Sequence, residues 1–191
     1  MQGLMLRSMQ AYVRGTFGAE VWAAVVREAT LPVDGFEPML RYGDGMADRV
    51  AQAAAQVLNR PADVLWEDVG THLVTNPRHE GVRRLLRFGG VGFTDFLYSL
   101  EELPDRARLA LPDLQVPDLV LQEVGPDRFC LTCKFPIAGA TRILGGVVMA
   151  MADDYGALVV IDYVAGEAIH IDVPEIRHTT GRRFDLAMPG A

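Results

Sequence analysis

The chain has 191 residues, of which 50% are hydrophobic and 23% are charged, a composition typical of one globular domain with a substantial core. Its 18 basic and 25 acidic residues give a net charge of -7, and no Lys/Arg block stands out, which argues against nucleic-acid binding. No apolar run approaches the roughly 20 residues that span a bilayer, and two cysteines do not make a disulfide framework. We therefore expect a soluble, cytoplasmic, bacterial-type domain with no membrane partner.

The first half of the sequence predicts helices. Apolar residues recur at helical spacing over residues 4–16, 20–29 and 46–57. Pro61 is typical of a first helical turn and opens the next helix, and a further helix lies around residues 82–86.

Pro104 is the most unusual residue of this half. The spacing of Phe93, Leu97, Leu100 and Leu111 predicts one helix over 93–111, with Pro104 on its apolar face. Proline in a helix interior removes a backbone donor and costs about 3 kcal/mol. A defect of that size on a core-facing surface calls for a specific reason.

Beyond Pro112 the apolar spacing changes from helical to alternating, as in strands. It predicts four strands, over residues 119–124, 129–137, 158–163 and 168–173. A helix over 141–155, closed by Gly156, separates the two hairpins. The order predicts an α+β fold whose four-stranded sheet is antiparallel.

Two separated segments resemble one family. They are MQGLMLRSMQAYVRGTFGAEVW at the start of the chain and LLRFGGVGFTDFLYSLEEL…RLALPDLQVPDL further on. They resemble the haem nitric oxide/oxygen binding (H-NOX) family, whose fold also occurs in the sensor domain of soluble guanylate cyclase. The resemblance runs over about residues 1–175. It implies one domain over 1–178, with an N-terminal helical lobe (1–62), a C-terminal α/β lobe (63–178) and a tail (179–191).

The resemblance also places the chemistry of the family on this chain. The histidine that holds haem iron in the family falls on Pro104, and the Tyr-x-Ser-x-Arg motif that clamps the propionates falls on Cys133, Phe135 and Ile137. Strand alternation predicts that these last three side chains share one face, toward the pocket. Proline offers iron no lone pair, and isoleucine cannot replace an arginine fork on a carboxylate. We therefore expect no haem cofactor and a pocket that is apolar or filled.

The expected pocket lining consists of Leu97, Leu100, Pro104, Leu111, Pro112, Cys133, Phe135, Ile137 and Leu144. The resemblance implies a sensory or regulatory domain without catalytic residues or a bound metal. Its partner would be a signalling protein such as a histidine kinase or a cyclic-nucleotide enzyme, with a small apolar ligand in the pocket. Two alternatives stay open. One is a haem-binding sensor of NO or O2 whose iron is held by His72 or Cys133, and the other is an interaction module without any ligand.

Three other features carry less specific predictions. Cys130 and Cys133 lie three residues apart on a strand, so they point to opposite faces and act as independent thiols rather than as half a zinc site. His170 alternates with its isoleucine neighbours, which predicts a solvated sheet face. The Asp153–Asp154 pair ends a helix, where the helix dipole disfavours negative charge.

Overall fold

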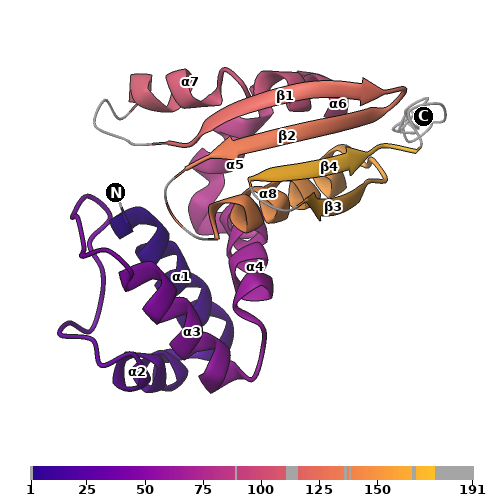
Figure 1. The fold of residues 1–191 in the computed structure, drawn as a ribbon. Helices are drawn as coiled ribbons and strands as arrows, with labels where there is room; N and C mark the ends of the chain where they lie inside the picture. The colour runs from indigo at the N-terminus through magenta and orange to yellow at the C-terminus, as the bar shows by residue number, and fades with distance from the viewer. Residues whose placement is uncertain are drawn as a thin grey trace, which may run out of the picture.

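The structure is a computed structural model, and it describes residues 2–88, 90–110, 116–135, 137, 139–164 and 167–174. Within that part of the chain it contains eight α-helices, one short 3-10 helix and four strands (Figure 1). The predicted α+β fold with a four-stranded antiparallel sheet is confirmed. None of the helices in the described ranges is long and apolar enough to cross a membrane.

The N-terminal helices enclose a core of their own. They are α1 (Gln2–Phe17), α2 (Ala19–Glu28), α3 (Met46–Leu58) and α4 (Ala62–Thr75). Side chains such as Met9, Trp22, Phe36 and Val50 are buried among them. In Figure 1 the first three helices lie together at the lower left, and α4 runs from them toward the sheet.

The helix expected over 93–111 is instead two helices, and this corrects the prediction for Pro104. A 3-10 helix, η1 (Pro77–His79), and α5 (Glu80–Arg87) are followed by α6 (Phe93–Ser99) and α7 (Leu103–Ala110). Pro104 therefore sits in the first turn of α7. A missing N–H costs little there, because the first-turn N–H groups have no partner within the helix.

The four strands form one sheet in the order β1-β2-β4-β3. Their bounds are β1 (Asp118–Gly125), β2 (Arg128–Lys134), β3 (Val160–Val164) and β4 (Ala168–Asp172). Helix α8 (Ala140–Tyr155) connects the hairpins and ends at Gly156 in a left-handed conformation, as predicted. Together with α6 it covers one face of the sheet, where Leu131, Ile169 and Ile171 are fully buried (Figure 1).

Helix α4 belongs to both cores and crosses α8 at very short range. Leu65 and Val69 pack in the N-terminal core, and Val74 packs in the sheet core. A side chain on Gly70 or Gly146 would collide with the backbone of the opposite helix.

The predicted ranges of the two lobes, 1–62 and 63–178, stay a prediction. The expected tail, 179–191, lies outside the described residues.

Candidate functional site

Pro104 is buried at the start of α7, next to the sheet core. Leu97 and Leu100 of the preceding helix and its turn are fully buried in that core. Arg106, two residues after the proline, connects α7 to the preceding elements by donating to the carbonyl of Ser99 at 2.8 Å and to that of Leu85 at 3.3 Å. The position where the resemblance places the iron ligand is thus buried beside apolar side chains.

The end of β2 differs from the prediction. The strand stops at Lys134, and the Ile137 amide then donates to the Phe135 carbonyl at 2.8 Å in a tight turn. Phe135 packs against the sheet core, whereas Ile137 packs against the N-terminal core. The prediction that Cys133, Phe135 and Ile137 share one face of a strand is therefore wrong. The physical reason is the proline at position 136, which has no N–H for a strand ladder.

Cys133 remains on the strand and faces inward, with 1% of its surface exposed. Its amide donates to the Glu167 carbonyl at 2.7 Å. Burial raises the pKa of its thiol to about 11, although a hydrogen bond with Thr141 acts in the opposite direction. The thiol therefore stays protonated at neutral pH, and a protonated thiol is a poor metal ligand.

The remaining predicted pocket residues divide between the described and the undescribed parts of the chain. Leu144 of α8 is buried in the same core as Leu97 and Cys133. Leu111 and Pro112 lie outside the described residues.

His72, the second candidate iron ligand, lies half-buried on α4 among residues of other elements. Its ring meets the rings of Tyr12 and His79 edge-on, each at 5.7 Å between centroids, and its Nε2 lies 3.0 Å from Asn76 Nδ2. Gly15 of α1 is also next to the ring. Burial, and then the nearby His79, lower the pKa of His72, so the imidazole is neutral. These contacts come from α1, from η1 and from Asn76 between α4 and η1, and none of them is with a predicted pocket residue.

The arginine nearest to Ile137 in the sequence is already paired. Arg142, in the first turn of α8, lies 3.0 Å from Asp63 and 4.0 Å from Glu67, and its guanidinium stacks on the Tyr163 ring at 3.7 Å. The Tyr163 hydroxyl donates to the Glu67 carboxylate at 2.6 Å, and burial together with this bond raises the pKa of Tyr163. Arg142 therefore contacts side chains of α4 and β3. Across the described ranges, no group of three or more His, Cys, Asp or Glu side chains is arranged to hold a metal ion.

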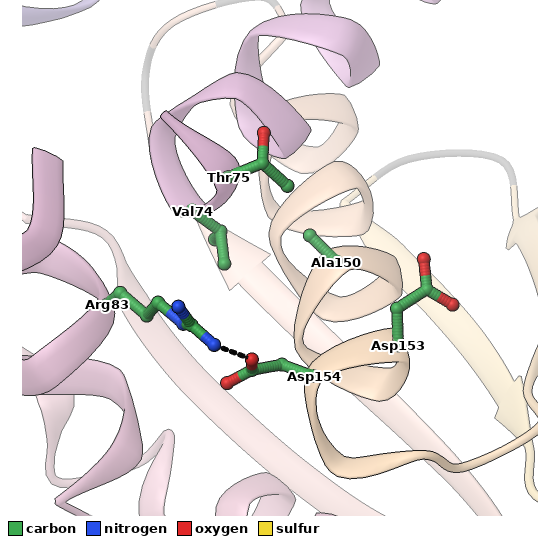
Figure 2. Close-up of a pocket in the computed structure, with 6 residues that line it drawn as sticks. All are labelled: Val74, Thr75, Arg83, Ala150, Asp153 and Asp154. Carbon is green, nitrogen blue, oxygen red and sulfur yellow. Dashed lines mark hydrogen bonds and ion pairs between the residues drawn. The ribbon is translucent and has the colours of Figure 1, made fainter. Parts of the chain in front are cut away.

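A cavity of about 320 Å³ lies between α4, α5 and the end of α8, and the sequence did not predict it. Figure 2 shows its six lining residues, Val74, Thr75, Arg83, Ala150, Asp153 and Asp154. Arg83 points at Asp154 and donates to it, and Arg87 lies 3.0 Å from the other oxygen of the same carboxylate. Two arginines of α5 therefore neutralise the acidic end of α8. In the sequence, only the Asp153–Asp154 pair indicated these ion pairs between α5 and α8.

The arrangement of these elements is that of the H-NOX proteins. An H-NOX protein from K. algicida, solved as a mutant with unliganded Fe(II), superposes with a TM-score of 0.75 at 17% identity, covering 93% of this chain and 98% of that one. A mutant H-NOX protein from S. oneidensis gives a TM-score of 0.74 at 15% identity, covering 91% of this chain and 96% of that one.

The sequence agrees with the fold. Residues 2–162 match the haem-NO-binding family, and the chain belongs to that family. Soluble guanylate cyclase 89Da of Drosophila melanogaster is 22% identical over 164 residues, which cover 86% of this chain. Soluble guanylate cyclase gcy-31 of Caenorhabditis elegans is 25% identical over 117 residues, covering 61% of this chain and 17% of that protein. The chain spans only 25% of the length of the Drosophila relative.

Proposed function

We propose that this H-NOX sensory domain has lost the conventional haem ligation of its family and signals through a pocket that is apolar or filled. Pro104 carries the proposal. The resemblance to the H-NOX family places the iron-ligating histidine of the family at this position. Proline is buried there and has no side-chain lone pair for iron.

The propionate end of the haem site supports the same conclusion. Cys133, Phe135 and Ile137 stand where the family has tyrosine, serine and arginine. A haem carboxylate beside these side chains would be buried without a charged partner, which is costly. Arg142 does not replace the missing arginine, because it already pairs with Asp63.

The other candidate ligands do not restore a haem site. Cys133 is held as a neutral thiol by burial. His72 packs against α1 and η1. These residues therefore do not fit a conventionally bound haem.

The proposed pocket lies around α7 and the end of β2. Its lining is the predicted set of Leu97, Leu100, Pro104, Leu111, Pro112, Cys133, Phe135, Ile137 and Leu144. Apolar surroundings of this kind favour a small apolar ligand held by burial of its surface. A ligand would act by favouring one position of α7 over another, since only a differential affinity shifts a conformational equilibrium.

The domain would pass this change to a signalling protein rather than catalyse a reaction. The guanylate cyclases among its relatives suggest a cyclic-nucleotide enzyme as the partner class. A histidine kinase is the second class that the H-NOX resemblance implies.

A haem titration tests the proposal. The purified chain is mixed with equimolar haemin, reduced, and exposed to NO, and its Soret band is recorded at each step. We expect only the broad spectrum of unligated haem, with no defined complex. A stoichiometric complex with a histidine-like ferrous spectrum that shifts with NO would contradict the proposal.

Variants then distinguish loss of haem binding from haem binding through a substituted iron ligand. If a complex forms and either His72→Ala or Cys133→Ala abolishes it, a substituted ligand holds the iron and the proposal fails. Conversely, the fourfold variant Pro104→His, Cys133→Tyr, Phe135→Ser and Ile137→Arg is expected to bind haem more tightly than the natural chain. The same variant without Pro104→His is its control, because it restores the propionate clamp and leaves iron without a ligand.

A further inference from the structure

The end of α5 places a large aromatic side chain in solvent. Phe88 follows the helix directly, keeps a helical backbone conformation and is 81% exposed. Its amide donates to the carbonyl of Arg84 at 3.1 Å, so the two residues lie one turn apart on the same face of the helix. A Cβ on Gly81, one turn before Arg84, would meet no atom within 4 Å. This face of α5 therefore lies open to solvent.

Helix α7 extends this open face through Arg106. The guanidinium of Arg106 lies over the Phe88 ring, 6.0 Å from its centroid, where a cation and an aromatic face attract each other. Leu109, one turn later on α7, is 86% exposed. We call the group of Arg84, Phe88, Arg106 and Leu109 the α5–α7 surface. Neighbouring exposed apolar side chains mark an interaction site, whereas single ones need no explanation.

The charge of this region is opposite to that of the chain as a whole. The chain has a net charge of -7, whereas residues 77–88 contain four arginines and one acidic residue, Glu80. Two of these arginines, Arg83 and Arg87, are compensated by Asp154. The excess of positive charge therefore comes from the part of α5 that faces away from α8.

The two arginines of the α5–α7 surface have no carboxylate partner. Arg84 forms no ion pair with any residue in the described ranges, and neither does Arg106. Arg106 donates instead to two backbone carbonyls. The acidic residue of α7, Asp105, is paired with Arg108 at 2.8 Å. Carboxylates of a binding partner can therefore approach this surface without breaking an existing ion pair.

We propose that the α5–α7 surface binds a segment of a protein partner in which acidic residues flank a large apolar side chain. The apolar side chain packs on Phe88 and Leu109, and the carboxylates face Arg84 and Arg106. Aromatic residues and arginine are the residue types that are enriched at the centre of protein interfaces.

Two other occupants fit this surface less well. A second copy of the chain would bring the same arginines face to face in a symmetric dimer, and like charges repel. An anionic membrane is held by clusters of about four to eight basic residues, and the two unpaired arginines fall short of that number. An acidic protein segment satisfies both the charge and the apolar side chains.

The surface is also connected to the predicted pocket. Arg106 and Leu109 belong to the same helix as Pro104, so a ligand that moves α7 would move half of the α5–α7 surface. This link rests on the function proposed above. Binding of the acidic segment to the resting chain does not rest on it, and it requires neither a pocket ligand nor haem.

A random-peptide display library tests the proposal. The library is selected on the folded natural chain, and recovered peptides are then titrated against the double variant Arg84→Glu, Phe88→Ser. We expect the recovered peptides to carry acidic residues beside leucine, phenylalanine or tryptophan. They should bind the double variant at least about tenfold more weakly than the natural chain, and binding should weaken as the salt concentration rises.

The double variant Met39→Ser, Arg41→Glu is the matched control. Both residues lie in the segment between α2 and α3, Met39 is 59% exposed, and Arg41 is exposed as well. This variant has the same change in net charge and a similar loss of apolar surface, so it should bind the peptides like the natural chain. Melting curves establish that both variants are folded.

Three results would overturn the proposal. The first is a selection whose peptides lack acidic residues or bind the Arg84→Glu, Phe88→Ser variant like the natural chain. The second is an equal loss of binding in the control variant. The third is binding of vesicles of phosphatidylserine and phosphatidylcholine in competition with the peptides, which would assign the surface to a membrane. The haem content of the chain affects none of these measurements, so they fail or succeed separately from the proposed function.

Discussion

The close crossing of α4 and α8 predicts that Gly146→Ala destabilises the fold. An ideal Cβ at Gly146 would lie 2.9 Å from the Thr71 amide nitrogen and nearer still to the Glu67 carbonyl oxygen. Both obstacles are backbone atoms, so no rotamer change relieves the collision and the helices must separate.

The magnitude follows from two opposing effects. Overpacking a core costs about 1–3 kcal/mol, and a backbone collision belongs at the upper end of that range. Replacing glycine by alanine inside a helix returns about 1 kcal/mol. The net loss is about 2 kcal/mol, which lowers the melting temperature of a chain of this size by about 4–8 °C.

Gly15→Ala in α1 is the matched control for this prediction. A Cβ there would meet its nearest neighbour, the His72 ring, at 3.6 Å, which is an ordinary contact. It should raise the free energy of unfolding by about 0.5–1 kcal/mol. Urea titration of both variants and of the natural chain measures these changes. A Gly146→Ala variant as stable as the natural chain, or a Gly15→Ala variant equally destabilised, would refute the reasoning.

Three further predictions concern polar contacts. Tyr163→Phe removes the 2.6 Å bond to the carboxylate on α4 and should lower the free energy of unfolding by about 1 kcal/mol. The pKa of His72 is lowered from 6.5 in the folded state, so the unfolded chain binds the proton first, and stability should fall as the pH drops below about 6.5. Asp154→Asn deprives two arginines of α5 of their partner and should lower the melting temperature at low salt, less so at high salt.

Each of these predictions has its own control. Tyr98→Phe removes a comparable 3.0 Å bond at an exposed position and should cost less than Tyr163→Phe. His72→Gln should reduce the loss of stability below about pH 6.5. An unchanged loss would contradict the assignment of this pH dependence to His72. Asp153→Asn removes an exposed carboxylate at the same helix end, where the helix dipole disfavours negative charge, so it should not lower the melting temperature.

Local patterns predicted most of the elements, because their causes are local. Gly156 ends α8 through a left-handed conformation that glycine adopts without strain. Alternating apolar residues predicted all four strands. Pro104 was predicted inside one long helix, whereas it lies in the first turn of α7. Leu100 keeps a helical backbone conformation after α6, so the helical spacing of apolar residues continues from α6 into α7.

Long-range register and pairing could not be predicted from these patterns. Arg83 and Asp154 are 71 residues apart, and only the tertiary fold brings the two side chains together. His170 lies opposite Cys130 on one side and Asp162 on the other through the register of three strands, which alternation alone does not fix.

The haem content of the chain isolated from haem-sufficient cells tests the central claim most directly. The account predicts far less than one haem per chain, because Pro104 offers iron no ligand and Cys133, Phe135 and Ile137 offer the propionates no charged partner. One haem per chain, with a ferrous spectrum that shifts on addition of NO, would contradict it.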